Sequence, residues 1–261
     1  MTEIVAIRDH RIYAGDALQG VHLDDESVHA VITDPPYCSG GTTEAGRCRA
    51  AVQGIRSGET VTESGGWFIG DNMTTAGLAW LLRAVAIEAH RVLVEGGSLA
   101  MFCDWRMLPT LAPAIESSGL RWVNMIAWDK GHMGMGTGFR PQHEMVLHFT
   151  KGTGDYHDRS VGNVIRTKRV HTSQRTHPTE KPVDLLRALV RVTTPPGGTV
   201  WDPFGGSGSM LEACDAEGRR AIIGDISGPR VAGIVARAEA TQGGLDFDGA
   251  SPPPAGAADA R

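Results

Sequence analysis

Cysteine is scarce in this chain of 261 residues, which contains only four. None of the four belongs to a CxxC pair, and none stands near paired histidines at zinc-finger spacing. Zinc sites and disulfide frameworks are recognised from such spacings. We therefore expect free thiols and no metal ion in the chain.

The sequence also lacks long apolar runs. No run approaches the roughly 20 residues that a membrane-spanning helix needs. The first residues, MTEIVAIRDHR, do not have the charged and then apolar pattern of a secretory signal. These absences argue against a membrane or secreted protein, so we expect a cytoplasmic protein without a membrane partner.

An excess of positive charge is absent as well. The formal net charge is -5, which gives no overall sign of a nucleic-acid partner. Binding to nucleic acid depends on where the charges lie, however, rather than on their sum. Local clusters of Lys and Arg must therefore decide whether the chain contacts nucleic acid.

The sequence does contain an alternation of short β-branched runs with helical patterns, which is typical of an α/β domain. With 41% hydrophobic residues, the chain can bury one large core. The predicted strands cover residues 10–16, 29–34, 98–104, 122–128, 143–150, 198–203 and 221–225. The predicted helices cover residues 78–93, about 106–117, a segment that begins near 182, and about 209–217. The pair Gly96 and Gly97 is expected to end the first helix.

We expect a single domain over residues 1–242. Within it, residues 38–66 are rich in Gly, Ser and Thr and predict a mobile loop that is either functional or disordered. Residues 151–176 carry six cationic and two acidic side chains, which makes this basic segment a candidate for contacts with nucleic acid. Residues 243–261 are rich in Gly, Ala, Pro and Asp, as in a disordered tail.

The run VITDPPY at 31–37 ends a buried strand with a carboxylate, two prolines and an aromatic ring. The prolines fix their own φ and restrict the residue before them, so this turn holds Asp34 and the adjacent backbone in one conformation. An exocyclic amine of a base is a poor nucleophile, because its lone pair is delocalised into the ring. Rigid acceptors for its N–H groups can free that lone pair, which is preorganisation of the kind that contributes most to catalysis. Tyr37 would add a stacking face for the base.

A second informative run is VWDPFGGSGSM at 200–210. A strand that ends in Asp-Pro-Phe, passes through glycines and opens a helix lets the backbone approach a ligand closely. About twenty residues later, another predicted strand ends in Asp225, placed to bind the two hydroxyls of a ribose. Taken alone, this pattern suits any adenosine-containing cofactor, including the dinucleotide of an NAD-dependent oxidoreductase.

Together these runs resemble the amino-group DNA methyltransferases of the β class. The shared features are Asp-Pro-Pro-Tyr, the Phe-x-Gly-x-Gly turn, AGD at 14–16, WDK and RPQHEMVLHFTKG within 128–152, and HPTEKP at 177–182. Their order along the chain is the family's order of catalytic motif, target-recognition segment and cofactor motif, and the resemblance covers about residues 10–240. It implies a Rossmann-like fold for an S-adenosylmethionine-dependent methyltransferase, with a circularly permuted, mostly parallel sheet of about seven strands.

The resemblance further implies S-adenosyl-L-methionine as cofactor, DNA as partner and a role for each motif. The catalytic group would be Asp34, Pro35, Pro36 and Tyr37, with the Asp34 carboxylate and the Pro35 carbonyl accepting the N–H groups of the amine. Asp16 would bind the adenine amino group of the cofactor, and Thr179 and Lys181 would lie near its methionine carboxylate. The full cofactor set would be Asp16, Ala17, Thr179, Lys181, Asp202, Phe204, Gly205, Gly206, Ser207, Gly208 and Asp225. Contacts to DNA would come from Arg159, Arg166, Lys168, Arg169 and Arg175.

Some alternatives stay open at the level of sequence. Asp at the first position of the tetrapeptide favours methylation of adenine N6, whereas the cytosine-N4 enzymes more often carry Ser there, and cytosine N4 is the alternative. A catalytically silent DNA-binding relative is a further hypothesis, against which the intact Asp34 argues. The short basic segment is compatible with a homodimer. The target sequence and a restriction endonuclease partner cannot be deduced from the chain.

Overall fold

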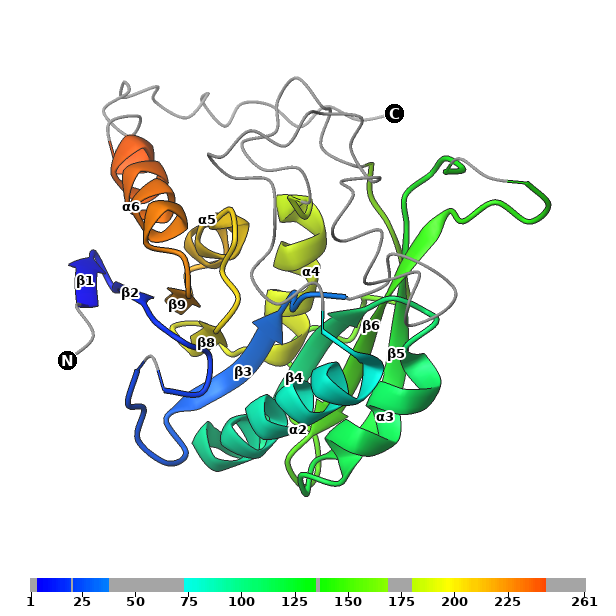
Figure 1. Ribbon diagram of the computed structural model, residues 1–261. Coiled ribbons are helices and arrows are strands. Elements are labelled where there is room, and N and C mark those ends of the chain that lie inside the picture. The colour runs from blue at the N-terminus through cyan, green and yellow to red at the C-terminus, as the bar shows by residue number, and fades with distance from the viewer. Residues whose placement is uncertain (1–3, 20, 38–72, 135–136, 169–179, 243–261) are drawn as a thin grey trace, which may run out of the picture.

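The computed structural model describes residues 4–19, 21–37, 73–134, 137–168 and 180–242, and among these nine strands form one sheet with helices on both faces (Figure 1). The strands are β1 (Ile4–Ile7), β2 (His10–Ala14), β3 (Val28–Thr33), β4 (Leu93–Cys103), β5 (Arg121–Asp129), β6 (His143–Thr150), β7 (Val164–Arg166), β8 (Thr199–Asp202) and β9 (Arg220–Asp225). The helices are α2 (Thr75–Val92), α3 (Leu108–Glu116), α4 (Val183–Thr193), α5 (Ser209–Ala216) and α6 (Gly228–Gln242). The expected loop 38–66 and tail 243–261 lie outside the described residues.

Each face of the sheet has its own hydrophobic core. Helices α2 and α3 pack on one face, and helices α4, α5 and α6 pack on the other. In β3, Val31 belongs to the first core and Ile32 to the second, because successive side chains of a strand point to opposite faces. Burial on both faces explains why the predicted central strands read as continuous apolar runs.

The strand order is β1-β2-β9-β8-β3-β4-β6-β5-β7, so the last two strands of the chain lie in the middle of the sheet. Strands β2, β9, β8, β3 and β4 all run in the same direction. The permuted and mostly parallel sheet that the sequence predicts is therefore confirmed. Its consequence is that the two informative runs, at the ends of β3 and β8, are neighbours in space.

The sheet has two more strands than the prediction of about seven. β1 pairs with β2 in antiparallel fashion, and β7 adds a parallel edge beside β5. Both are short and partly exposed, with four and three residues, so neither leaves a periodic signal in the sequence. β7 also lies inside the basic segment 151–176, which is thus partly built into the sheet. Helix α6 was not predicted either.

Gly96 and Gly97 do not end helix α2, and this prediction was wrong. The helix ends at Val92, and β4 already begins at Leu93. The glycines lie in an irregular stretch of β4, where the register against β3 shifts. Gly96 has a φ of +82°, and a Cβ at Gly97 would lie 2.9 Å from the carbonyl oxygen of Val94, so the bulge requires glycine.

Candidate active site

Three aspartates gather at the edge where the parallel strands end. Asp34 follows β3, Asp202 is the last residue of β8 and Asp225 is the last residue of β9. The Thr33 hydroxyl donates to Asp202 Oδ1 over 2.6 Å, which ties the end of the catalytic strand to the end of the cofactor strand. The carboxyl ends of parallel strands are where α/β proteins bind ligands. This edge is therefore the candidate active site.

The two carboxylate oxygens of Asp34 have different surroundings. Oδ2 lies 2.6 Å from the ammonium nitrogen of Lys181. Oδ1 is shielded from solvent and has no hydrogen-bond partner, and it is the sole carboxylate oxygen in this condition among the described residues. Burial raises the pKa of Asp34 above its usual range, and the Lys181 ammonium offsets this only in part. A buried acceptor left unpaired costs free energy, and such atoms in native proteins call for a functional explanation.

Lys181 is buried, and its ammonium joins two carboxylates. Besides Asp34, its Nζ lies 3.2 Å from Glu144 Oε2 and donates to the Tyr37 hydroxyl over 3.1 Å. The same nitrogen stands about 5 Å from the ring centroids of Tyr37 and Phe102. Burial disfavours the ammonium, but the two carboxylates outweigh that effect and raise the pKa of Lys181. The side chain is therefore a fixed, buried cation beside the catalytic run.

The sequence interpretation put Lys181 near the methionine carboxylate of the cofactor, whereas the structure gives this side chain protein partners. Its described partners are the acceptor Asp34, Glu144 and Tyr37. Lys181 stands just before Pro182 and helix α4. Helix α4 packs on the face of the sheet to which Ile32 of β3 points, and this places Lys181 beside the end of β3. The tertiary structure, and not the motif, supplies these partners.

Glu144 and Lys130 complete the cluster, and the sequence interpretation missed both. Glu144 stands near the start of β6, and Lys130 follows β5 and binds Glu144 Oε1 over 2.6 Å. Burial alone would raise the pKa of Glu144, but the ammoniums of Lys181 and Lys130 lower it to about 2. The available signal was an acid at the start of the apolar run HEMVLHFT, together with WDK on the preceding strand.

Asp225 is held by backbone amides on the cofactor side. Its Oδ2 accepts from Gly206 N over 3.1 Å and its Oδ1 accepts from Ser227 N over 2.8 Å. Arg230 lies 3.8 Å from the same carboxylate. Because each carboxylate oxygen can accept more than one hydrogen bond, Asp225 keeps acceptor capacity for a ligand.

The glycine turn after β8 is shaped for close backbone contact. A Cβ at Gly205 would lie 2.2 Å from a methyl group of Ile223, so only glycine fits against β9. Gly206 has a φ of +52°, and among the described residues a Cβ there would come within 4 Å of the Phe204 carbonyl oxygen alone, at 3.8 Å. Phe204 is half-buried and packs against the core that carries α2, while Ser207 Oγ lies 2.8 Å from Ser209 Oγ. The turn thus offers an open backbone surface next to Asp225.

Asp202 is buried between the other two acids. Its Oδ1 also accepts from Phe204 N over 3.1 Å. Burial, together with the nearby charges of Asp34 and Asp225, raises the pKa of Asp202 to about 7 in spite of these hydrogen bonds. The site therefore carries a concentration of negative charge that a cationic ligand would relieve.

Other predicted site residues divide into three groups. Asp16 is exposed just after β2, where Gly15 N donates to the Asp225 carbonyl, and Ala17 beside it is buried. Arg166 is exposed at the end of β7, 2.7 Å from Asp129, and Lys168 follows it. Three of the predicted residues lie outside the described part of the chain, namely Arg169, Arg175 and Thr179.

Arg159 is not brought together with Arg166. The chain leaves β6 at the opposite edge of the sheet, where Gly96 N donates to the Lys151 carbonyl. There Asp158 pairs with Arg191 near the end of α4. Arg159 therefore lies at the edge of the sheet opposite the three aspartates. For this reason we do not group it with Arg166 and Lys168.

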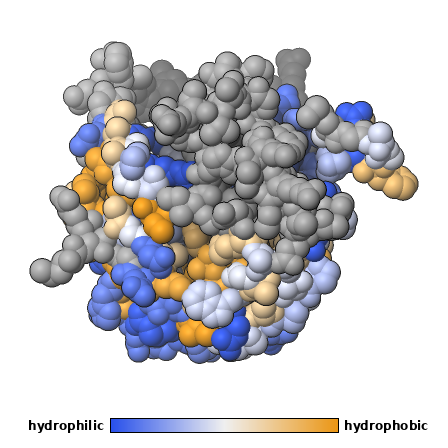
Figure 2. All heavy atoms as spheres, in the orientation of Figure 1, coloured by the Kyte–Doolittle hydropathy of each residue, from blue (hydrophilic) through white to orange (hydrophobic). Residues whose placement is uncertain are grey.

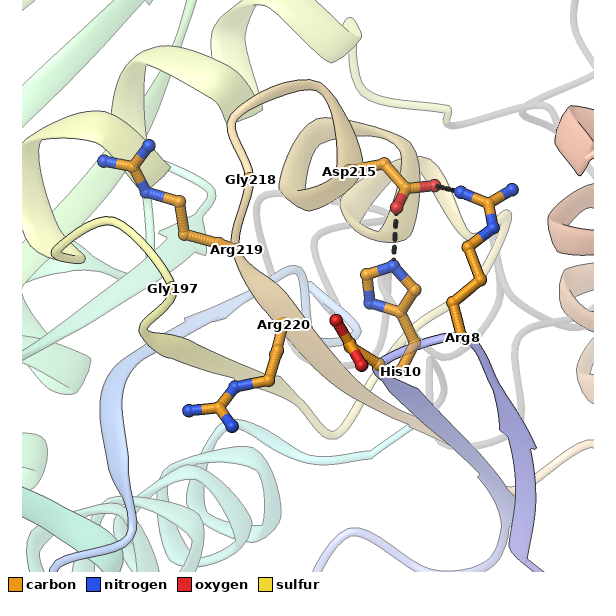
Figure 3. A pocket seen from close by; sticks show the side chains of 8 residues that line it. Arg8, His10, Gly197, Asp215, Gly218, Arg219 and Arg220 are labelled. Atoms are coloured by element: carbon orange, nitrogen blue, oxygen red, sulfur yellow. Dashed lines mark hydrogen bonds and ion pairs between the residues drawn. The ribbon is translucent and has the colours of Figure 1, made fainter. Parts of the chain in front are cut away.

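A cleft of about 420 Å³ also lies at this opposite edge (Figure 3). In it, Asp215 accepts from Arg8 and from Nε2 of the buried His10. The Ala221 amide donates to Nδ1 of His10, so both ring nitrogens have partners. These contacts join the β1–β2 turn to α5 and contain no part of the three-aspartate edge. Within the described residues there is also no cluster of three metal-ligating side chains and no helix able to span a membrane.

Comparisons with known proteins show which chains this one resembles. The Type II methyltransferase M.HpaI of Haemophilus parainfluenzae is 25% identical over 249 residues, which cover 84% of this chain and 71% of that enzyme. The solved PvuII DNA methyltransferase, named as cytosine-N4-specific, superposes with a TM-score of 0.68 at 16% identity, over 89% of this chain and 87% of that one. TTHA0409 of Thermus thermophilus, solved with S-adenosyl-L-methionine, gives a TM-score of 0.63 at 21% identity, over 90% and 96%. At these identities the structures establish the shared fold.

The site also fits S-adenosyl-L-methionine, a cofactor with a positive sulfonium and a positive ammonium group. The buried carboxylates supply the opposite charge, and the glycine turn supplies open backbone at Gly206. The profile of the N6_N4_Mtase family, described as DNA methylase, matches residues 28–234, from β3 into α6. That range contains Asp34, Lys181, Asp202 and Asp225. The chain therefore belongs to this family of DNA methylases, whose methyl donor is S-adenosyl-L-methionine.

Proposed function

We propose that this DNA methylase modifies an exocyclic amino nitrogen, N6 of adenine, and that Asp34 is the acceptor that activates it. The observation that carries the proposal is the buried Oδ1 of Asp34, which has no partner among the described residues although Oδ2 is bound by Lys181. A substrate N–H group would satisfy this oxygen. The unpaired acceptor is thus an expected feature of a site that lacks its substrate.

The reaction requires the lone pair of the amine to leave conjugation with the base. Asp34 Oδ1 would accept one N–H and the buried Pro35 carbonyl would accept the other, so that the nitrogen becomes pyramidal. Lys181 holds Oδ2 and so fixes the direction of Oδ1. Fixed acceptors of this kind need no reorganisation when charge develops on the nitrogen.

S-adenosyl-L-methionine, held by the residues at the ends of β8 and β9, would supply the methyl group and leave as a neutral thioether that keeps the S–C electron pair. The amine nitrogen gives its lone pair to the new N–C bond and becomes positively charged. One of its protons must then leave, and Asp34, whose pKa burial raises, is the nearest carboxylate to receive it. No covalent bond between enzyme and base is needed, so none of the cysteines has a role.

On the cofactor side, Asp225 would bind the ribose hydroxyls and the turn from Phe204 to Gly208 would line the cofactor. Asp202 and Asp16 would face its cationic and adenine groups, with Ala17 beside them. These assignments rest on the position of each residue at the carboxyl edge, next to β2, β8 and β9. Thr179 stays a prediction from the motif.

Tyr37 would stack on the base that is turned out of the duplex. The Lys181 ammonium would hold the ring for this role, because it donates to the Tyr37 hydroxyl over 3.1 Å and stands 5.1 Å from the ring centroid. A base–aromatic stack contributes about 1–3 kcal/mol, comparable to the few kcal/mol that flipping costs. Arg166 and Lys168, exposed at the same edge, would bind phosphates.

The modified base can be identified directly. The chain is expressed in a host without its own adenine and cytosine-N4 methylation, and the DNA is digested to nucleosides for mass spectrometry. We expect N6-methyladenine. Finding N4-methylcytosine alone would reject the adenine assignment in favour of the cytosine alternative, which the PvuII enzyme's name illustrates for the same fold.

The role of Asp34 has a separate test. Asp34→Ala should abolish methyl transfer and leave the dissociation constant for S-adenosyl-L-methionine within a few-fold of wild type. Asp104→Ala is the matched control, because Asp104 lies after β4 at the same edge but pairs with Arg106. Loss of cofactor affinity as large as the loss of rate would place Asp34 in the cofactor site.

A further inference from the structure

The connection between β5 and β6, residues 130–142, forms an arm whose described parts, 130–134 and 137–142, extend beyond the body of the protein (Figure 1, the green arm at the upper right). At its base, Lys130 N donates to the Gln142 carbonyl over 3.0 Å. Asp129 Oδ1 accepts from Gly131 N and from the Gln142 side chain, both over 2.8 Å. The arm is therefore fastened where it leaves the sheet.

The outer part of the arm is held by bonds within itself. Gly134 N donates to the Pro141 carbonyl over 2.7 Å, and the Arg140 guanidinium donates to the Gly134 carbonyl over 2.7 Å. Gly131 and Gly138 have φ values of +75° and +70°, and among the described residues nothing lies within 4 Å of the position of a Cβ at either. The shape of this part of the arm therefore comes from backbone turns rather than from core packing.

The arm exposes apolar side chains to solvent. Phe139 is 109% exposed relative to the reference state and Met133 is 56% exposed. Figure 2 shows the arm standing clear of the rest of this face. A single exposed apolar residue needs no explanation by itself, so a role for Phe139 must be argued from the charges beside it and from the position of the arm.

The charge of the arm favours a polyanion as that partner. Residues 130–142, KGHMGMGTGFRPQ, contain no Asp or Glu. Lys130 at the base of the arm is paired with Glu144, but His132 and Arg140 lie further out, and Arg140 is adjacent to the exposed ring in sequence. A cation next to an aromatic ring suits a nucleic acid, which offers a phosphate beside each base.

The position of the arm is tied to the acceptor site. Trp128 and Glu144 are paired across the base of the arm, and Glu144 binds Lys181, which binds Asp34. The arm therefore leaves from the edge to which a base must be delivered. A duplex that presents its base to Asp34 would lie across this edge and meet the arm.

We propose that the arm 130–142 contacts the DNA duplex and that Phe139 enters the stack beside the flipped base, filling the space that the base leaves. Apolar side chains are known to act as wedges between base steps, at a cost in unstacking that extra contacts repay. The inference rests on the proposed function, because the space exists only if a base is flipped. Phe139 is thus a positioning residue for the transfer reaction.

The test uses a duplex that carries the methylated site, mapped by single-molecule sequencing of DNA modified by the wild-type chain. Methyl transfer is measured for Phe139→Ala, Phe139→Trp and the control Met133→Ala. On the fully paired duplex, Phe139→Ala should lower kcat/KM about 5- to 150-fold, the equivalent of one lost base–aromatic stack. Phe139→Trp and Met133→Ala should stay close to wild type.

A second duplex with a mismatch opposite the target base reduces the cost of flipping. The loss in Phe139→Ala should shrink there, and the proposal is overturned if the loss is equal on both duplexes or absent on both. Fluorescence anisotropy of the paired duplex, which needs no methyl transfer, should show weaker binding by Phe139→Ala. Unchanged affinity would also overturn the proposal.

Failure of the proposed function would look different. In that case the wild-type chain itself would leave no methylated amino group in DNA, whatever residue stands at 139. A contact between two copies of the chain is the other use for an exposed ring. If sedimentation shows that Phe139→Ala lowers the mass of the protein in solution, the arm belongs to that contact and the DNA role is wrong.

Discussion

The Lys181 ammonium lies 2.6 Å from Asp34 Oδ2 and 3.2 Å from Glu144 Oε2, so one buried cation pairs with two partly buried carboxylates. Lys130 supplies a second cation to Glu144, and the four charges balance. A buried charge is tolerated only when it is paired. The Lys181 ammonium therefore offsets part of the effect of burial, which raises the pKa of Asp34.

Lys181→Met should move the acid limb of the pH profile of kcat to higher pH. Without the ammonium, burial and the Glu144 charge raise the pKa of Asp34 further, so a larger fraction of the enzyme is protonated and inactive at a given pH. Lys130→Met is the control, because it removes a cation from Glu144 without a contact to Asp34. If the acid limb of kcat lies at the same pH in wild type and in Lys181→Met, Lys181 does not act through Asp34, even if the variant is less stable.

Asp225→Ala should weaken binding of S-adenosyl-L-methionine by about 1–3 kcal/mol, the cost of leaving polar partners unpaired. Isothermal titration measures the change. The loss should be smaller for a cofactor analogue without ribose hydroxyls, because those groups are the proposed partners. Asp184→Ala, at an exposed acid of α4, should bind as wild type does. If Asp225→Ala loses the same binding free energy for S-adenosyl-L-methionine and for the analogue, Asp225 does not bind the ribose hydroxyls.

Binding of S-adenosyl-L-methionine should tighten as the pH rises from 6 to 8. The pKa of Asp202 is about 7 without ligand, so the residue is mainly protonated at pH 6 and mainly ionised at pH 8. A cationic cofactor favours the ionised form and should release a proton when it binds near pH 6.5. Titrations in two buffers of different ionisation enthalpy detect that proton. Asp202→Asn should remove both effects, and a pH-independent affinity for wild type would contradict the assignment.

The raised pKa of Asp202 also predicts how the stability of the ligand-free protein depends on pH. Because the folded-state pKa of Asp202 is raised above its ordinary value of 3.8, the folded state holds a proton that the unfolded state has lost. The contribution of Asp202 to stability is therefore largest in acid and falls as the pH rises through about 7. Asp202→Asn should flatten this part of the dependence of the unfolding free energy on pH, measured by urea titration.

Replacing Arg166 and Lys168 with alanine should reduce DNA affinity and flatten its dependence on salt, by nearly one unit of log-log slope for each lost phosphate contact. Sequence preference should survive, since phosphate contacts position the protein without reading bases. Arg159→Ala is the matched control at the opposite edge of the sheet, and its curves should overlay those of wild type. If the curves of the double variant overlay those of wild type, the basic segment is an ordinary exposed surface without a role in DNA binding.

Much of the fold could be predicted because its central strands are buried on both faces and therefore read as continuous apolar runs. The strands that end at Asp34, Asp202 and Asp225 all lie where the sequence puts them, to within a residue or two. The short edge strands β1 and β7 were missed, because their pairing depends on neighbours distant in the chain. Glycine pairs are ambiguous for the same reason: Gly96 and Gly97 shape a bulge whose existence depends on contact with β3.

The candidate site divides in a similar way. The motif predicts that Asp34 and the glycine turn meet, and the strand order brings them together. The partners of Lys181 could not be predicted from the sequence. Glu144 belongs to β6 and Lys181 precedes α4, and the two meet only in the folded chain. Local pattern identifies which residues carry chemistry, whereas long-range packing decides which charge each of them faces.

The placement of β8 and β9 in the middle of the sheet also bears on synthesis of the protein. A nascent chain that has passed β6 already contains Asp34, yet β2 and β3 each present an unpaired edge until residues 199–225 emerge. Open strand edges invite association with other chains. The hydrogen bond from Thr33 to Asp202 spans 169 residues of sequence and cannot form before β8 is made. A prematurely terminated product would therefore be prone to aggregate and unable to modify DNA, so a ribosome that stalls late releases no partly active methylase.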